Sequence, residues 1–450
     1  LLGQTEGAFC RHRMDATPLL QASDNHLRIK VYPPLHPGPT KEKTQQTTGT
    51  NGGRLTQDAP TYLATTGWDW IPTVRGRNMG VYDNLYLERN RNARLSDPYV
   101  ETTVGPDTLC TITPKVMVEN CTDSERNLLI RGEIGPLTFE KHITLPPRSQ
   151  HEATFSPDIH RQLSRQALPL WWPNDMGAPY LHHATYALYE QGTRIDTLTY
   201  AVGLRQVTYS DTDKALKIYV NNRRLVPMGG NWGFSEVNLN YRQREYEAAI
   251  AYHRDQHFNM IRNWVGQTSD ESFFESCDRN GLMVWQDFWL ANPSDGPDPS
   301  DENLFATSAE DFVKRIRRHP SVAIYCGRNE GRPTDTLDGM LSHTIDSLSP
   351  QLLYISDSAD GGVSGHGPYK NLEEKEYFAR QTGRLHTERG MPCIPTSESM
   401  RRMFGGEDRW PQDHLWGQHD FTQQGAQGGK SYNERLEALF GKPQSMEQFA

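Results

Sequence analysis

The chain has 450 residues, of which 35% are hydrophobic and 10% aromatic, and its 47 basic and 56 acidic side chains give a net charge of −9. This length is enough for about three domains; the aromatic content excludes a disordered chain, and the acidic balance disfavours a nucleic-acid partner. No apolar run reaches the length of a membrane-spanning helix, so we expect no membrane partner.

The first 95 residues alternate apolar and polar side chains in short runs separated by Pro, Gly, Thr and Asn. The clearest runs, at 26–34 and 80–88, are typical of β-strands. Between them, residues 37–60 form a stretch without an apolar pattern, which is longer than ordinary connections within a domain. We therefore predict a β-rich domain over residues 1–95 that carries one long loop.

Residues 96–209 continue this alternation in short runs at near-regular spacing. The runs lie at 115–122, 128–134, 141–147, 184–190 and 197–203. Such spacing favours a second domain built as a β-sandwich.

From residue 210 onward, helical periodicity alternates with short apolar runs. We predict helices at 241–258, 269–281 and 308–319, and strands at 216–232, 259–264, 282–288, 321–330, 352–359 and 391–399. Thr268, with Glu271 three residues later, is expected to cap the second helix, and Gly281 to end it. This alternation favours a (β/α) barrel over residues 210–450, with its catalytic residues at the carboxyl ends of the strands.

Two glutamates end predicted barrel strands. Glu330 follows an apolar strand, where burial favours the protonated form that a general acid needs. Glu398 ends the last predicted strand, and a cation such as Arg401 or Arg402 would keep it ionised, as a nucleophile requires. No single helix can join residues so far apart in sequence, but a closed barrel can. Such a pair is what glycoside hydrolysis requires, and a surface ion pair is the structural alternative.

The other candidate side chains give weaker indications. Trp264 and Trp416 are flanked by polar residues and are the better candidates for sugar platforms, although any one Trp is more simply explained by a core. No zinc-finger spacing is present, and His414, His419 and Asp420 lack the helical His spacing beside a Glu, so we expect no metal. The absence of a P-loop and of a G-x-S-x-G motif disfavours phosphate binding and a serine triad. The six cysteines are interpreted as free thiols, with a disulfide between Cys110 and Cys121 as the alternative.

Several segments, in order along the chain, resemble glycoside hydrolase family 2, in the branch of β-mannosidases and exo-β-D-glucosaminidases. They are the sandwich segment 67–87, the immunoglobulin-like segments 170–188 and 202–207, the barrel strands 229–232, 260–266, 284–289 and 327–330, and the nucleophile strand 394–403. The resemblance implies three domains. They are a jelly-roll-like β-sandwich that is incomplete at its N-terminal side (1–95), an immunoglobulin-like β-sandwich (96–209) and a (β/α)8 TIM barrel without its last strand (210–450).

The resemblance also implies a retaining hydrolase in which Glu330 is the acid/base and Glu398 the nucleophile. The implied substrate-binding residues are Asn329 at the sugar 2-hydroxyl, Asp69 from the first domain, and Trp264, Arg262, Asp287 and Trp416 around the −1 pocket. His366 and Tyr369 are expected in a loop at the barrel mouth. No metal or organic cofactor is implied, because the two carboxylates perform the covalent and proton-transfer steps.

The expected partner is a glycoside or oligosaccharide with a terminal β-linked sugar, in the first place a β-mannoside. An exo-β-D-glucosaminidase is the alternative, and an additional acidic residue beside the −1 site would favour it. A carbohydrate-binding protein without turnover is the alternative from another functional class. The chain opens at Leu1 without an initiator Met or a signal peptide, so we expect a fragment, with a periplasmic or extracellular location if a leader has been lost. The sequence gives no indication of oligomeric state.

Overall fold

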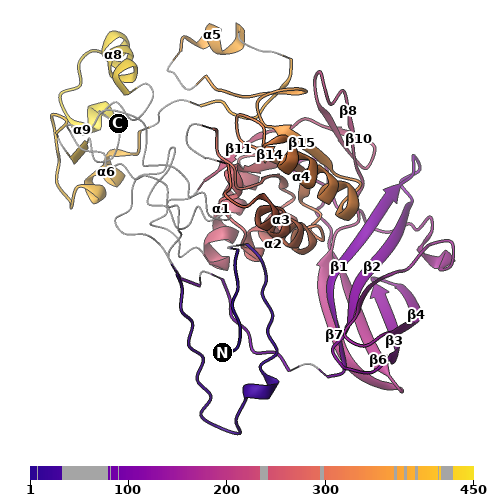
Figure 1. Ribbon diagram of the computed structural model, residues 1–450. Helices are drawn as coiled ribbons and strands as arrows, with labels where there is room; N and C mark the ends of the chain where they lie inside the picture. Colours follow the sequence, from indigo (N-terminus) through magenta and orange to yellow (C-terminus); the bar gives the residue numbers. More distant parts are fainter. Residues whose placement is uncertain are drawn as a thin grey trace.

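The computed structural model describes residues 1–7, 9–32, 80–81, 83–89, 91–233, 242–293, 298–368, 372–379, 383–390, 394–413, 415–416 and 429–450. Within these ranges the chain forms an all-β unit and a parallel α/β unit (Figure 1). The C-terminal helices lie on the side of the α/β unit away from the all-β unit (Figure 1). No helix among the described residues has the length and apolar character needed to cross a bilayer.

The all-β unit is an antiparallel sandwich, as predicted. One sheet has the strand order β1-β2-β5 and the other β4-β3-β6-β7. Side chains along β2 alternate strictly between buried and partly exposed, because each strand turns one face to the shared core. The elements are β1 (Ala93–Val104), β2 (Cys110–Asn120), β3 (Arg126–Ile134), β4 (Leu137–Leu145), β5 (Gln150–Thr154), the 3-10 helix η3 (Arg161–Leu163), β6 (His182–Glu190) and β7 (Thr193–Val202). The five described cysteines, Cys110 and Cys121 among them, are free thiols.

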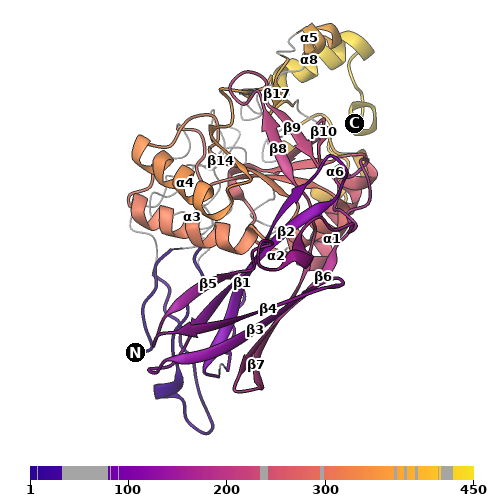
Figure 2. The same cartoon turned by 90° about the vertical axis from the view of Figure 1, so that its right-hand side faces the viewer.

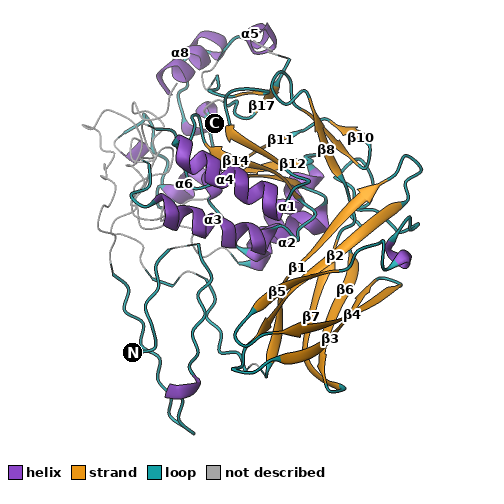
Figure 3. Ribbon diagram, turned by 45° about the vertical axis from the view of Figure 1, so that its right-hand side comes forward, coloured by secondary structure: helices purple, strands orange, loops and turns teal. Residues whose placement is uncertain are grey.

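A small antiparallel sheet, ordered β10-β9-β8, connects the sandwich to a parallel sheet ordered β11-β12-β13-β14-β15. The strands are β8 (Val207–Ser210), β9 (Lys217–Val220), β10 (Arg223–Leu225), β11 (Gly229–Trp232), β12 (Met260–Asn263), β13 (Met283–Asp287), β14 (Val322–Arg328) and β15 (Leu353–Asp357). The helices are α1 (Gln243–Asp255), α2 (Glu271–Asn280), α3 (Glu302–Ile316) and α4 (Asp335–Leu348), and Figure 3 shows them packed along one side of the strands. This arrangement is consistent with part of a TIM barrel.

The predicted helices are present, but the cap of one of them differs from the prediction. The helices predicted at 241–258, 269–281 and 308–319 are all present, and α4 was not predicted. Asp270 rather than Thr268 caps α2, because its carboxylate accepts the N–H of Ser272 at 2.9 Å. Gly281 ends this helix in the left-handed conformation, with φ 71°.

The strands predicted at 26–34 and 80–88 are absent from the described residues of the first 92. The regular structure in this described part is the 3-10 helix η1 (Thr17–Leu19). The apolar side chains of Leu27, Ile29 and Val31 are 58%, 52% and 48% exposed. A strand buries such a row only against partner strands, and the described residues supply none here. The long loop expected at 37–60 lies outside the described residues.

The N-terminal segment is attached to both larger units. Phe9 is buried and stacks on Trp289, with ring centroids 4.1 Å apart. Arg11 pairs with Asp311 of α3 at 2.8 Å and with Asp97 of β1 at 2.6 Å. The segment therefore joins the sandwich to the α/β unit, and it lies beside both of them in Figure 2.

In the C-terminal part, β16 (Val363–Ser364) pairs with β17 (Leu385–His386). In sequence, α5 lies between these two strands, and α6, α8 and α9 follow β17. The helices are α5 (Glu374–Ala379), α6 (Ser397–Met403), α8 (Gly429–Phe440) and α9 (Met446–Phe449). The strand predicted at 391–399 is wrong: residues 394–396 are loop, and Thr396 caps α6 by accepting the N–H of Ser399. Side chains of α6 and α9 form a hydrophobic cluster separate from the core of the parallel sheet.

A buried ionic cluster stabilises the amino end of the parallel sheet. His319 is 2% exposed, and its two ring nitrogens lie 2.6 Å from Asp278 and 2.7 Å from Glu271. Burial alone would lower the pKa of His319, but the two carboxylates outweigh it and raise this pKa to about 9. The imidazole is therefore held as a cation between α2 and β14.

Candidate active site

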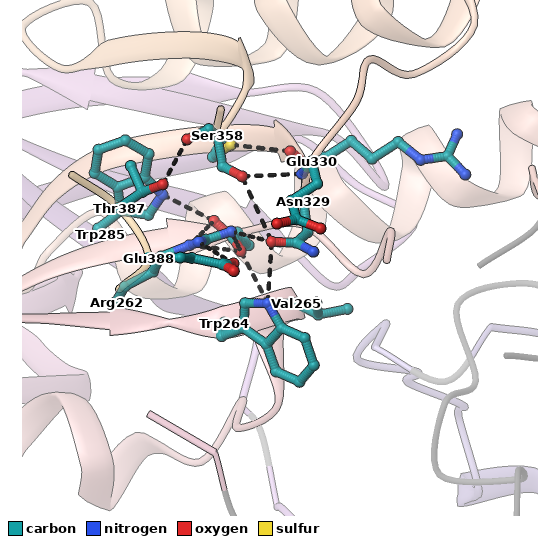
Figure 4. A network of polar contacts seen from close by, with 12 residues as sticks. Arg262, Trp264, Val265, Trp285, Asn329, Glu330, Ser358, Thr387 and Glu388 are labelled. Atoms are coloured by element: carbon teal, nitrogen blue, oxygen red, sulfur yellow. Dashed lines mark hydrogen bonds and ion pairs between the residues drawn. The ribbon is translucent and has the colours of Figure 1, made fainter. Parts of the chain in front are cut away.

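Four of the predicted site residues lie together at the carboxyl edge of the parallel sheet. Arg262 is the penultimate residue of β12, and Asp287 ends β13. Asn329 and Glu330 follow β14, and Figure 4 shows them close to Arg262. Parallel strands all end at the same edge, so residues far apart in sequence meet there. The register pairs Arg262 with Trp285 on the neighbouring strand and thereby brings the side chains of Arg262 and Asp287 within reach of each other.

Arg262 is the centre of this network and is 4% exposed. Its guanidinium donates to Asp287 at 2.7 Å, to Glu388 at 2.7 Å and to Asn329 Oδ1 at 2.6 Å. Burial would lower the pKa of Arg262, but Asp287 and Glu388 together raise it above its ordinary value. Asp287 is in turn fixed by the indole N–H of Trp285 at 2.8 Å.

The amide of Asn329 has a defined orientation. Its Oδ1 accepts from Arg262 and, at 3.0 Å, from Nε1 of Trp264. Both of these partners can only donate, so the amide oxygen must face them. Among the described residues, none accepts a hydrogen bond from the Nδ2 of Asn329, which is therefore left to donate to a bound molecule.

Glu330 carries the second carboxylate of the site. Its side chain is 17% exposed, and Nδ1 of His366 lies 3.2 Å from its Oε1. The backbone of Glu330 has φ 47°, a left-handed conformation that non-glycine residues adopt rarely and often at functional sites. His366 thus lies in a loop at the mouth of the site, as expected, whereas Tyr369 is outside the described residues.

Glu388 is a site residue that the sequence analysis missed. It follows β17 by two residues and is 8% exposed, and Figure 4 shows its carboxylate directed at Arg262. The available signal was an acidic residue two positions after Leu385–His386. A strand of two residues is too short for its periodicity to be recognised.

Glu398 is not brought to this network. It lies in the first turn of α6, where its side chain is 73% exposed and pairs with Arg402 at 2.5 Å. The prediction that an arginine accompanies Glu398 is confirmed, but the predicted strand that would have carried Glu398 to Glu330 is replaced by this helix. Its neighbours belong to the C-terminal hydrophobic cluster, not to the core of the parallel sheet.

Two further predicted site residues also differ from expectation. Trp416 is 1% exposed and packs in the C-terminal cluster with Phe404 and Phe449, so it is a core residue there and not a wall of the Arg262 network. Asp69 lies outside the described residues. Trp264, at 8% exposed, does border the network through its bond to Asn329.

The arrangement suits covalent and proton-transfer chemistry. The carboxylate of Glu388 lies in a hydrogen-bonded network that also contains a fixed cation and an amide donor. Glu330 is joined to this network through its backbone N–H, which donates to Ser358, and the hydroxyl of Ser358 donates to Asn329. Within the described residues, no three or more His, Cys, Asp or Glu side chains are grouped so that they could hold a metal ion.

Two family models match the chain. Residues 1–83 match the model described as "Glycosyl hydrolase 2 galactose-binding domain-like", and residues 93–205 match "Glycosyl hydrolases family 2".

Curated relatives and solved structures agree with these matches. The chain is 30% identical over 375 residues to mannosylglycoprotein endo-beta-mannosidase of Lilium longiflorum, which covers 76% of this chain and 37% of the relative. It is 24% identical over 462 residues to exo-beta-D-glucosaminidase of Streptomyces avermitilis, which covers 97% of this chain and 47% of the relative. The fold matches the exo-chitosanase CsxA of Amycolatopsis orientalis with a TM-score of 0.74 at 17% identity, over 98% of this chain and 52% of that one. The chain thus spans about half, or less, of the length of the proteins it matches.

Proposed function

Because this chain belongs to glycosyl hydrolase family 2, we propose that it cleaves terminal β-linked sugars with retention of anomeric configuration, through a covalent glycosyl-enzyme intermediate. One observation supports the proposal: Arg262 binds both Glu388 and Asn329, the residue that precedes Glu330, so the segments that carry the two carboxylates meet at one guanidinium. Retaining glycosidases require such a pair, with the carboxyl groups about 5–5.5 Å apart.

In this mechanism Glu388 is the nucleophile and Glu330 the acid/base. The ion pair with Arg262 stabilises the anionic carboxylate that must attack C1 of the sugar. Glu330 is the more exposed of the two at 17%, which suits a group that must exchange a proton with the leaving group and then with water.

The proposed reaction has two steps, formation of the glycosyl-enzyme and its hydrolysis. In the first, an oxygen of Glu388 bonds to C1, the bond from C1 to the leaving oxygen breaks, and the proton of Glu330 passes to that oxygen. In the second, Glu330 takes a proton from water, the water oxygen bonds to C1, and the bond between C1 and Glu388 breaks. Both carboxylates return to their starting states.

The orientation of Asn329 supports a sugar with a hydroxyl at C2. Its Oδ1 is occupied by Arg262 and Trp264, so it offers only an N–H donor to the sugar. A hydroxyl can accept that hydrogen bond, whereas an ammonium group can only donate. This favours a β-mannoside as substrate over the 2-amino sugar of an exo-β-D-glucosaminidase.

The proposal is tested by assaying the chain on nitrophenyl β-mannoside, β-glucosaminide and β-galactoside in parallel, and by following the anomer released by NMR. We expect turnover of the mannoside with release of the β-anomer first. Initial release of the α-anomer would contradict the retaining mechanism. Turnover of the glucosaminide alone would contradict the substrate assignment. Binding of the glycosides without any turnover would leave a carbohydrate-binding protein.

A further inference from the structure

A buried serine connects the loop of the acid/base to the end of the neighbouring strand. Ser358 follows β15 and is 0% exposed. Its Oγ accepts the backbone N–H of Glu330 at 3.0 Å, and its own N–H donates to the carbonyl of Arg328 at 3.2 Å. The next amide, that of Gly331, donates to Asp357 at 3.0 Å. The backbone around Glu330 is therefore fixed on both sides by the end of β15.

These bonds matter because the conformation of Glu330 is unfavourable by itself. A φ of 47° persists in a non-glycine residue only where the surrounding structure determines it. The N–H of Glu330 is the group that Ser358 holds, so the serine hydroxyl stabilises the conformation that aims the acid/base side chain. Full burial of Ser358 leaves little room for water to replace its hydroxyl.

The same serine is bonded from its other side by the residue that precedes Glu388. The hydroxyl of Thr387 donates to the carbonyl of Ser358 at 2.6 Å, and the N–H of Thr387 donates to the carbonyl of Ser364 at 2.8 Å. Figure 4 shows Ser358 between Glu330 on one side and Thr387 on the other. A short path thus runs from the amide of Glu330, through Ser358 and Thr387, to Glu388.

We propose that Ser358 and Thr387 form a hydroxyl bridge that sets the relative position of the acid/base Glu330 and the nucleophile Glu388. They are positioning residues, because their hydroxyls bond to other groups of the protein. The hydroxyl of Ser358 accepts the N–H of Glu330 and donates to Oδ1 of Asn329 at 3.5 Å, and the hydroxyl of Thr387 donates to the carbonyls of Ser358 and Ser364. The inference rests on the proposed function. Its physical basis is that double displacement needs both carboxylates correctly placed on one anomeric carbon, and a misplacement of about 1 Å can lower the rate about 10²-fold.

Thr387→Val and Thr387→Ser form the decisive pair. Valine keeps the shape of threonine but cannot donate to Ser358, whereas serine keeps the donor. We expect kcat on nitrophenyl β-mannoside to fall by about 10–10²-fold in Thr387→Val with little change in KM, and Thr387→Ser to retain most of the native kcat. Equal kcat in the two variants, with thermal midpoints like that of the native chain, would overturn the bridge.

Ser358→Ala tests the other half of the bridge, with Ser321→Ala as its control. Ser321 is also 0% exposed, and it precedes the same strand β14 at the opposite end, where its Oγ bonds to no described residue. Ser358→Ala should slow substrates with poor leaving groups more than activated ones, because it misplaces the proton donor. Ser321→Ala should change neither.

Hydrogen–deuterium exchange gives a readout that does not depend on turnover. In Ser358→Ala the amide of Glu330 should lose protection, and in Ser321→Ala it should keep it. Unchanged protection in Ser358→Ala overturns the bridge even if activity falls. A native chain that turns over no glycoside, while Ser358→Ala still exposes this amide, contradicts the proposed function and leaves the bridge intact.

Discussion

Replacement of Glu388 is the sharpest test of the site, because Glu398 provides a matched control. Glu388→Ala should lower kcat by about 10⁴–10⁶-fold, the loss that follows removal of one member of a covalent catalytic unit in other hydrolases. Azide should restore part of the turnover of an activated substrate, because it can attack C1 in the space that the side chain leaves. Glu398→Ala should turn over substrate like the native chain.

The two variants should also differ in stability. Glu388 and Arg262 form a buried pair, with side chains 8% and 5% exposed, and removal of one partner from such a pair costs about 3–5 kcal/mol. Arg262 keeps Asp287 at 2.7 Å, so we expect the lower end, about 3 kcal/mol. Glu398 and Arg402 are 73% and 78% exposed in an i,i+4 pair, which contributes only about 0.3–0.5 kcal/mol.

Urea denaturation and turnover should be measured on the same preparations. Glu388→Gln separates chemistry from stability, because its amide oxygen can still accept from Arg262 while its neutral side chain cannot form the glycosyl ester. It should be folded and inactive. An inactive Glu398→Ala that azide rescues, beside an active Glu388→Ala, would refute the assignment.

Three further predictions follow from contacts described above, two in the candidate site and one in the buried His319 cluster. Glu330→Gln should slow substrates with poor leaving groups far more than activated ones, and equal losses on both would remove Glu330 from the acid role. Trp264→Phe loses its bond to the Asn amide and should lower kcat/KM roughly tenfold, whereas Trp416→Phe should lower only thermal stability. The pKa of His319 is raised in the folded state to about 9, so its contribution is complete below pH ~6.5 and is lost as the pH rises to about 9. The free energy of unfolding should fall by roughly 3 kcal/mol over that interval in urea titrations, and His319→Gln should abolish this slope.

The parallel sheet and most of its polar edge could be predicted because both follow from local patterns. Buried strands appear as short apolar runs, and every parallel strand ends at the same edge. The strand-end pattern was therefore enough to expect Asp287 and Glu330 together, whereas Arg262 was expected there from the family resemblance. The same pattern did not hold for Glu398, because its predicted strand is a helix. The partners of Arg262 could not be predicted, because a guanidinium can reach several acceptors, and the choice depends on packing.

The predicted strands of the first domain show that a local pattern is not sufficient to form a strand. The alternation at Leu27, Ile29 and Val31 is a correct local signal for a strand, but a strand forms only when neighbours complete its hydrogen bonds and bury one face. The described residues provide no such neighbours, and these side chains are about half exposed. An alternating pattern therefore indicates that a segment can form a strand, but it does not show whether partner strands are available.

The two candidate nucleophiles differ in what surrounds them, and our proposed assignment rests on this difference. Thr396 is a helix cap, and the four-residue spacing of Glu398 and Arg402 is typical of an exposed helical ion pair, in which the side chain of Glu398 is 73% exposed. A nucleophile must instead be held in one orientation where water is excluded. Glu388 meets that requirement, because the buried guanidinium that binds it also binds the residue next to Glu330. One cation therefore orients both halves of the proposed reaction.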